Sequence, residues 1–318
     1  MAKLLVRLPL LVLFSLLSCD AFDIPTRPGD KFPPPPPPLP QPEIVAAPFD
    51  FASLRGYSAF ALVGCTREER RALLFEGLAH GFNTPRVCGE TEYWDGGPDD
   101  DHPRFPRNLG SLRELLDDAA RISGVQVLLV PNCTLRDSVP VAEQIEWDRQ
   151  VRALVVATGY PNIAVEVVNE FWHPDSLIGK QPIAAMIAAW NAAGIPTGTD
   201  DSVCRDDFTL QHRLFGHAAF YSFHPCRTIQ EGLHSVRPWD PDFNWLRRLQ
   251  GANGSRPVMI SESVCYADPN EYGGLCTADR SRVQNALNAA LATGVGWVYH
   301  SREGLRAKPP YSWWPEPR

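Results

Sequence analysis

The sequence has 318 residues, of which 44% are hydrophobic and 21% are charged, and its formal net charge is −7. This balance is typical of a globular protein with room for one large domain, and it excludes a collagen-like or wholly disordered chain. No block of lysine and arginine is present, which argues against a nucleic-acid partner.

The first 19 residues are typical of an export signal. Two basic residues precede a mostly apolar stretch, 8–17, that is too short to span a membrane comfortably. The stretch is followed by Ser18 and Cys19, and it resembles a bacterial lipobox, in which the cysteine becomes the lipidated first residue. We therefore expect an exported lipoprotein, tethered to a membrane through Cys19 and facing the periplasm or the cell exterior. Because Leu17 is less typical of a lipobox, cleavage by an ordinary signal peptidase is the alternative.

A proline-rich segment, 20–47, comes next. It contains an unbroken run of prolines from Pro33 to Pro38, which cannot donate backbone hydrogen bonds and favours polyproline II. An extended spacer and a disordered linker both place this segment outside the fold. The folded domain is expected over 48–318.

The chain has eight cysteines, and setting Cys19 aside leaves an odd number, so at least one is free or pairs between chains. Cys265 and Cys276 bracket one loop and are the first disulfide prediction, and Cys204 with Cys226 is the second. No C-x-x-C pair is present, so we expect no structural zinc and no other metal.

Short apolar runs alternate with stretches of helical periodicity from about residue 51 onward. The predicted strands are 58–63, 83–87, 125–130, 163–168, 196–198, 219–223, 258–261 and 296–299. The predicted helices are 68–80, 111–122, 141–157, 182–193, 242–249 and 279–293, with 208–215 as a weaker candidate. A capping box formed by Ser111 and Glu114 is expected to open the second helix.

Alternation of strands and helices predicts a parallel sheet, and eight repeats over this length predict a single (β/α)8 TIM barrel. A doubly wound sheet is the alternative. It would favour a glycine-rich turn after the first strand, but no G-x-G-x-x-G follows residue 63.

Catalytic groups in such a barrel lie at the carboxyl ends of the strands. Arg86 lies near the end of the second predicted strand, and the pair Asn169 and Glu170 follows the fourth. His224 follows the sixth predicted strand, and Glu262 follows the seventh. The eighth predicted strand contains Trp297.

This set resembles the retaining glycoside hydrolases of clan A, barrel enzymes that include many cellulases, mannanases and xylanases. In that clan an Asn-Glu pair ends the fourth strand and a second glutamate ends the seventh. The resemblance, which covers about residue 48 to the C-terminus, implies Glu170 as the acid/base and Glu262 as the nucleophile. It also implies substrate-binding positions at Arg86, Asn169, His224 and Trp297, with Arg86 supporting the nucleophile.

Elementary chemistry agrees with these roles. Cleavage of a glycosidic bond needs one protonated carboxyl for the leaving oxygen and one carboxylate that attacks the sugar carbon or activates water. In a retaining enzyme the two carboxyl groups are roughly 5–5.5 Å apart. We therefore expect a retaining glycosidase that acts on an oligo- or polysaccharide and needs no cofactor.

Simpler roles remain open for several of these residues. Glu170 is also suited to capping a helix, and Trp297 to packing in the core. Glu166 faces the same side as Glu170 and is expected to be a buried structural carboxylate, or the acid if Glu170 is not. Asp200 and Asp201 are expected to cap a loop rather than to bind a metal. The rival functions are a non-catalytic carbohydrate-binding surface lipoprotein and a transglycosylase.

Overall fold

The chain divides into two units, residues 1–41 and 42–318. The computed structural model describes residues 44–90, 107–133, 139–169, 178–202, 215–224, 247–248, 250–251, 254–262, 265–266, 279–301, 303–304, 307 and 309–317. The predicted export signal with Cys19 and most of the proline-rich segment lie outside these residues. In the part of the chain that is described, no helix has both the length and the apolar composition needed to cross a bilayer.

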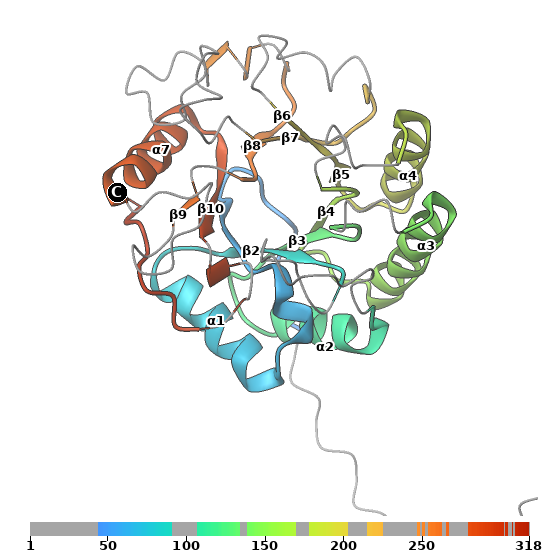
Figure 1. Ribbon diagram of the computed structural model, residues 1–318, viewed down its shortest axis with the longest axis horizontal. Helices are drawn as coiled ribbons and strands as arrows, with labels where there is room; N and C mark the ends of the chain where they lie inside the picture. Colours follow the sequence, from blue (N-terminus) through green and yellow to red (C-terminus); the bar gives the residue numbers. More distant parts are fainter. Residues whose placement is uncertain are drawn as a thin grey trace, which may run out of the picture. The chain divides into compact units, whose positions relative to one another are not determined.

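The second unit is a (β/α)8 barrel, as the alternation predicts (Figure 1). All paired strands are parallel, and the first pairs with both the second and the last. The barrel strands are β1 (Arg55–Ser58), β2 (Thr84–Cys88), β3 (Val127–Val130), β4 (Ile163–Glu166), β5 (Thr197–Gly198), β6 (Asp200–Ser202), β7 (Tyr221–His224), β8 (Val258–Ile260) and β10 (Gly296–Ser301). A short strand, β9 (Cys265–Tyr266), pairs with β10 outside the ring.

One barrel strand is interrupted at Thr199. β5 pairs with β4 on one side of this residue, and β6 pairs with β7 on the other, so together they make the fifth of eight barrel strands. The neighbouring Gly198 lies so close to Phe220 that a Cβ atom on it would be 2.5 Å from the Phe220 carbonyl oxygen. Glycine therefore permits the close approach that closes the ring at this point.

The first strand lies earlier than predicted. The apolar run 58–63 was the prediction, but the strand is Arg55–Ser58, and Phe60–Gly64 forms a 3-10 helix, η1, with Phe60 fully buried. No apolar run marks this strand in the sequence, because the residues that face the barrel interior, Gly56 and Ser58, are small. A Cβ atom on Gly56 would lie 2.7 Å from a methyl group of Val298 on β10.

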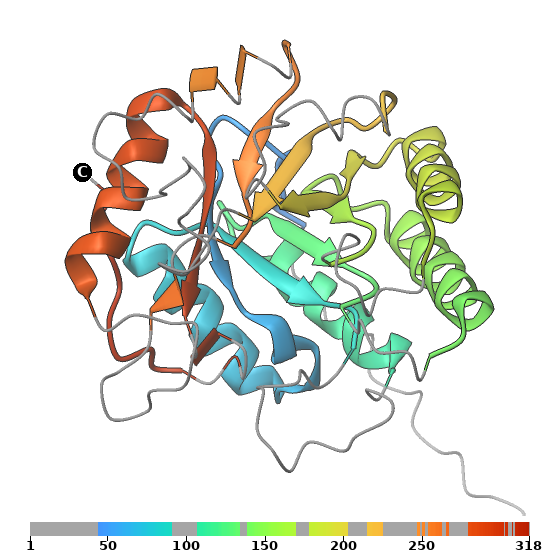
Figure 2. The ribbon, with the colours of Figure 1, turned by 45° about the horizontal axis from the view of Figure 1, so that its top comes forward.

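The barrel helices surround the strands and pack against their outer side (Figures 1 and 2). They are α1 (Arg67–Ala79), α2 (Leu109–Ala120), α3 (Val141–Thr158), α4 (Lys180–Ala192) and α7 (Arg280–Thr293). These five match predicted helices to within two residues at each end. The remaining predicted helices, 208–215 and 242–249, lie mostly outside the described residues.

The predicted capping box of the second helix is wrong. α2 begins two residues earlier, because the Asn108 side chain accepts hydrogen bonds from the backbone N–H groups of Gly110 and Ser111. An asparagine cap satisfies the same unpaired donors that a serine would, and it places Ser111 inside the first turn. A complete capping box opens α1 instead, between Thr66 and Glu69.

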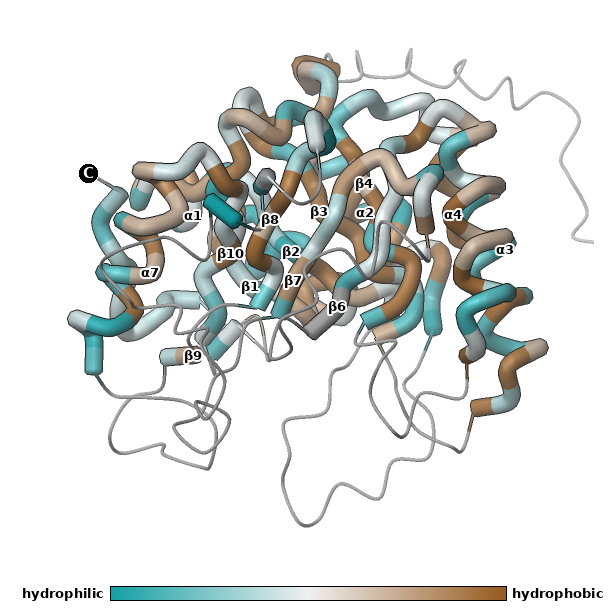
Figure 3. Tube along the Cα trace, turned by 90° about the horizontal axis from the view of Figure 1, so that it is seen from above, coloured by the Kyte–Doolittle hydropathy of each residue, from teal (hydrophilic) through white to brown (hydrophobic). Residues whose placement is uncertain are grey.

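Two apolar cores lie on opposite sides of the barrel strands. The barrel interior is filled by six fully buried residues: Leu54, Leu128, Ala164, Phe220, Met259 and Val298. A much larger core lies between the strands and the helices. Accordingly, α3 and α4 alternate between hydrophobic and hydrophilic segments along their length (Figure 3). The carboxyl ends of the strands point polar side chains inward, above the apolar interior.

A buried acid joins two of the helices. Asp148 on α3 accepts a 2.7 Å hydrogen bond from the indole N–H of Trp190 on α4 and a 3.3 Å bond from Arg152. Burial raises the pKa of Asp148 to about 6, and the bonds from Trp190 and Arg152 offset part of that effect. A pKa above the unfolded value means that the folded state loses stability as the pH rises through about 6.

We predict that Asp148→Asn raises the melting temperature at pH 8, because the amide keeps an oxygen for Trp190 and carries no buried charge. The expected gain is about 1–3 kcal/mol in the free energy of unfolding at pH 8, and it shrinks toward pH 4. Thermal melts of both proteins at the two pH values measure it. A gain of equal size at pH 4, or a loss at pH 8, would contradict the assignment.

Candidate active site

Arg86 is the centre of a polar cluster at the carboxyl ends of the barrel strands. It is the third of the five residues of β2, and its side chain is completely buried. Its Nε donates to Glu166 Oε2 at 2.7 Å, and its Nη1 donates to Glu262 Oε1 at 2.8 Å. Its Nη2 donates to Asn169 Oδ1 at 2.8 Å. One guanidinium therefore links strands β2 and β4 to the segment that follows β8.

A histidine and an aspartate extend the cluster on the other side of the barrel. His224 Nε2, at the end of β7, lies 2.8 Å from Asp200 Oδ2 on β6 and 3.7 Å from Glu262 Oε1. Asp200 Oδ2 is also 3.9 Å from Arg86 Nη2. Both side chains are at most 2% exposed, so these contacts form with little screening by water.

A second histidine faces the other oxygen of the same glutamate. His300 on β10 lies with its Nε2 4.0 Å from Glu262 Oε2, and its Nδ1 is 2.7 Å from the hydroxyl of Ser58 at the end of β1. Glu262 is therefore approached by Arg86 and His224 on one oxygen and by His300 on the other. A carboxylate in such surroundings is held in one orientation.

The charges of the cluster shift the pKa values of its members. Burial by itself lowers the pKa of Arg86, but the charges of Glu166, Glu262 and Asp200 outweigh burial and hold it above its ordinary value. Burial raises the pKa of Glu166, and the charge of Asp200 raises it further, against the opposing effects of Arg86 and His224. Arg86 is thus a permanent cation, and the pKa of the buried Glu166 carboxyl lies above its ordinary value.

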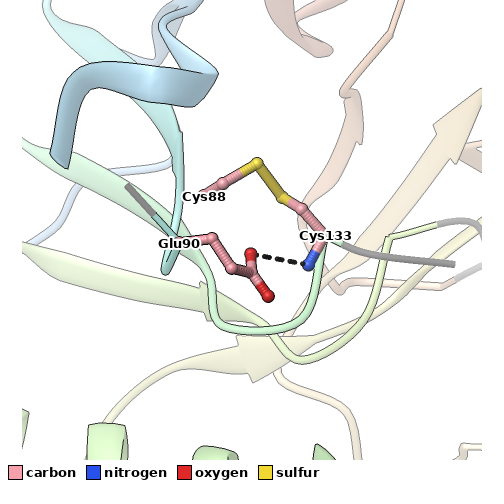
Figure 4. A group of neighbouring side chains, drawn as sticks. All are labelled: Cys88, Glu90 and Cys133. Carbon is pink, nitrogen blue, oxygen red and sulfur yellow. Dashed lines mark hydrogen bonds between the residues drawn. A yellow bond between two sulfur atoms is a disulfide. The ribbon is translucent and has the colours of Figure 1, made fainter. Parts of the chain in front are cut away.

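An aromatic ring and a disulfide support the guanidinium. Phe60, in η1, lies with its ring centroid 5.1 Å from the Arg86 guanidinium carbon, in cation–π contact. Phe60 packs against Cys88, Val130 and Cys133 in a small buried cluster. Cys88 and Cys133 form a disulfide between the ends of β2 and β3 (Figure 4). The disulfide fixes the strand end that carries Arg86.

Glu90 fixes the same region from the polar side. Its carboxylate accepts a 3.3 Å hydrogen bond from the backbone N–H of Cys133, as Figure 4 shows. The buried carboxylate is also 3.8 Å from Arg107, which lies just before α2. The loop ends around β2 and β3 are thus held by a covalent bond, a hydrogen bond and an ion pair.

Two groups of potential metal ligands occur among the described residues, and neither fits a metal. Cys88, Glu90 and Cys133 form one group, but its two sulfur atoms are bonded to each other and are not thiolates. Glu166, Asp200 and His224 form the other. There the Arg86 guanidinium, 2.7 Å from Glu166, already supplies the positive charge that these carboxylates require.

The structure brings together four of the residues that the sequence singles out: Arg86, Asn169, His224 and Glu262. All four are at most 3% exposed, so none of them is a solvated surface residue. Glu166 lies in the same cluster as a buried carboxylate, as predicted. Glu170 lies outside the described residues, and so does its distance from Glu262.

Trp297 does not lie in the cluster, so its predicted place at the sugar site is wrong. It is the second residue of the six-residue strand β10, and its side chain faces outward against Phe82 and Tyr299. At 1% exposure it has no free face for a sugar ring. Inward positions on β10 alternate with it, and they are occupied by Val298 and His300.

Other predictions also need correction or stay open. Asp200 is not a loop cap, because it is completely buried beside Arg86 and His224. The disulfide predictions involve Cys204, Cys226 and Cys276, which lie outside the described residues. The disulfide between Cys88 and Cys133 was not predicted, because 45 residues separate the two cysteines in the sequence. The signal that could have found this disulfide is that the two cysteines follow neighbouring predicted strands, 83–87 and 125–130, whose carboxyl ends lie close together.

Comparisons with known proteins are consistent with this architecture. No family model matches the sequence, and no curated protein matches it either. Among solved structures, the chain is similar to a glycoside hydrolase of family 5 from Bacteroides vulgatus, with a TM-score of 0.57 and 12% identity over 82% of this chain and 60% of that one. It is similar to a β-mannanase from Streptomyces thermolilacinus, with a TM-score of 0.51 and 17% identity over 78% of each chain.

A family 113 β-1,4-mannanase gives a TM-score of 0.54 and 12% identity, over 80% of this chain and 88% of that one. The chain spans 50% to 63% of the length of the first three structures that it resembles. Because the sequence identity is so low, these similarities show the TIM-barrel fold alone.

We predict that Arg86→Gln lowers the free energy of unfolding by about 3–5 kcal/mol at pH 7, because it leaves buried carboxylates without their cation. Adding Glu166→Gln should recover part of this loss. Urea unfolding at pH 7 and pH 4 measures both, and the loss should shrink at pH 4 as the carboxyl groups take up protons.

The control is Arg113→Gln, which removes a surface ion pair with Asp117. Such a pair contributes about 0–1 kcal/mol. An effect of Arg86→Gln no larger than that of the control would show that the buried cluster does not depend on the guanidinium.

Proposed function

We propose that this protein is a retaining glycoside hydrolase with Glu262 as the nucleophile and Glu170 as the acid/base. The observation that carries the proposal is the position of Glu262. It is a buried carboxylate at the carboxyl end of a barrel strand, 2.8 Å from a permanent cation. A nearby positive charge favours the ionised form, which is the form that attacks a sugar carbon.

The acid/base assignment is supported by the residue before it. Asn169 is uncharged, and its Oδ1 accepts a hydrogen bond from Arg86, which makes it part of the cluster. The pair Asn169 and Glu170 follows β4, and Glu262 follows β8, the seventh barrel strand. The sequence order Asn-Glu and then Glu, at these two strand ends, is that of clan A. Glu166 is already bonded to Arg86 deeper in the barrel, which favours Glu170 as the proton donor.

The reaction then proceeds in two steps. Glu262 attacks the anomeric carbon while Glu170 gives a proton to the leaving oxygen, and a glycosyl ester forms on Glu262. Glu170 next removes a proton from water, which cleaves the ester and returns the original configuration. The positive charge of Arg86, 2.8 Å from Glu262 Oε1, stabilises the Glu262 carboxylate as it leaves the sugar in the second step. The site needs no cofactor for this chemistry.

A panel of oligo- and polysaccharides assayed for released reducing ends tests the activity. β-Mannan belongs in the panel, because several proteins of similar structure are mannanases. Release of reducing ends from any member supports the proposal. Binding without release would favour a carbohydrate-binding protein, and transfer to added acceptor sugars in place of release would favour a transglycosylase.

The two glutamates should differ in their response to azide. In Glu170→Ala with an aryl glycoside whose leaving group needs no proton, azide replaces water and gives a glycosyl azide of retained configuration. In Glu262→Ala, azide occupies the vacated space and gives the inverted product. NMR of the products assigns both configurations. Full activity in either variant, or the same configuration from both, would refute the assignment.

We also propose export and anchoring of the protein through a lipid on Cys19, as the signal-like segment at residues 1–19 indicates. The native protein should then begin at Cys19, carry a diacylglycerol and partition with membranes. Intact mass and membrane fractionation measure this, with Cys19→Ser as the unlipidated control. A mature N-terminus downstream of Cys19 and without lipid would contradict it.

A further inference from the structure

We propose that Ser58, His300 and Glu262 form a relay in which the Ser58 hydroxyl fixes the imidazole tautomer and His300 positions the second oxygen of Glu262. The three side chains come from three barrel strand ends. The kinetic part of this inference rests on the proposed glycosidase function, whereas its structural part does not.

The geometry of the relay is specific to individual atoms. The Ser58 hydroxyl lies 2.7 Å from His300 Nδ1, a hydrogen-bond distance. The opposite ring nitrogen, Nε2, lies 4.0 Å from Glu262 Oε2. The other carboxylate oxygen, Oε1, accepts the bond from Arg86. His300 therefore faces the oxygen that Arg86 does not bind.

Ser58 is held rigidly in place. Its backbone oxygen accepts a 2.6 Å hydrogen bond from the Tyr311 hydroxyl. Gly304 packs so closely on it that a Cβ atom would lie 2.4 Å from the Ser58 carbonyl oxygen. The side chains of Ser58 and His300 are both buried, and the Phe60 ring lies 5.8 Å from the imidazole. The hydroxyl is thus presented to one ring nitrogen in a fixed position.

Two neighbours of the ring, Ser58 and Glu262, favour one tautomer. If Nδ1 carried the proton, the lone pair of Nε2 would face the Glu262 carboxylate, and the two regions of negative potential would repel each other. If the Ser58 hydroxyl donates to Nδ1, the proton is on Nε2, and the N–H dipole points toward Glu262 Oε2. The second arrangement satisfies both neighbours.

The distance from Nε2 to Oε2 determines how His300 acts. At 4.0 Å it exceeds a hydrogen bond, so in this structure the N–H acts as an oriented dipole at the carboxylate. Hydrogen bonds in active sites commonly shorten once substrate is bound. His300 is accordingly a positioning residue that orients Oε2 of Glu262, the oxygen to which Arg86 does not donate.

NMR of histidine labelled with ¹⁵N tests the tautomer without any enzyme assay. In the full chain at pH 7, the His300 ring, assigned by its disappearance in His300→Gln, should show a protonated Nε2 and an unprotonated Nδ1. In Ser58→Ala the hydroxyl donor to Nδ1 is lost, so the share of the tautomer with a protonated Nε2 should fall. A proton on Nδ1, or on both nitrogens, in the unaltered protein would overturn the proposal.

Kinetics with an active substrate from the panel test the consequence. Ser58→Ala should lower kcat/KM about 5- to 10-fold, as expected for the loss of one neutral hydrogen bond. The same change made in the His300→Gln background should have no further effect, because Ser58 acts through the imidazole. Additive losses in the two variants would overturn the relay.

Thr84→Val is the matched control. Thr84 is a completely buried residue on the adjacent strand β2, and its hydroxyl donates to Asn83, away from the cluster. Its loss should leave the His300 spectrum and kcat/KM unchanged within about 2-fold. If the unaltered protein cleaves no glycoside, the proposed function fails, and the NMR result alone decides whether the relay exists.

Discussion

The ion pairs of Arg86 are the constraint on which the rest of the site depends. One buried guanidinium bonds to Glu166, Glu262 and Asn169, and it lies within 3.9 Å of Asp200. Buried carboxylates this close together repel one another, and burial opposes their ionisation. The buried Arg86 guanidinium offsets this repulsion and holds the carboxyl groups of Glu166 and Glu262 in fixed positions. Under the proposed function, these contacts fix the nucleophile in place before any substrate arrives.

The surroundings of Arg86 explain other features of the barrel. Phe60 supports the face of the guanidinium, and the disulfide between Cys88 and Cys133 joins the strand ends on either side. The apolar residues of the barrel interior lie below the cluster and exclude water from it. A polar cluster of this kind does not add stability to the fold, because desolvation of the charges offsets their attraction. Its value lies in a fixed arrangement of charge at the mouth of the barrel.

Much of this arrangement could be predicted from the sequence. Parallel strands direct their carboxyl ends to one face, so polar residues at those ends must meet, and Arg86, Asn169, His224 and Glu262 do. The predictions failed where packing overrides local pattern. β1 is recognisable only through the close approach of Gly56 to Val298, a contact between residues 242 positions apart. Trp297 was misplaced because side chains alternate between the two faces of a strand, and its packing against Phe82 shows that it lies on the outer face of β10.

The most direct test of the central claim is chemical trapping of the nucleophile. A panel of activated 2-deoxy-2-fluoro glycosides, chosen from the sugars that the protein cleaves, should form a stable glycosyl ester on the enzyme. Fluorine slows both steps, and the activated leaving group restores the rate of the first step only, so the ester accumulates. Peptide mapping by mass spectrometry locates the label. The account predicts a single label on Glu262, lost in Glu262→Ala. A label on Glu166 or another residue, or turnover of the natural substrate with inversion, would contradict it.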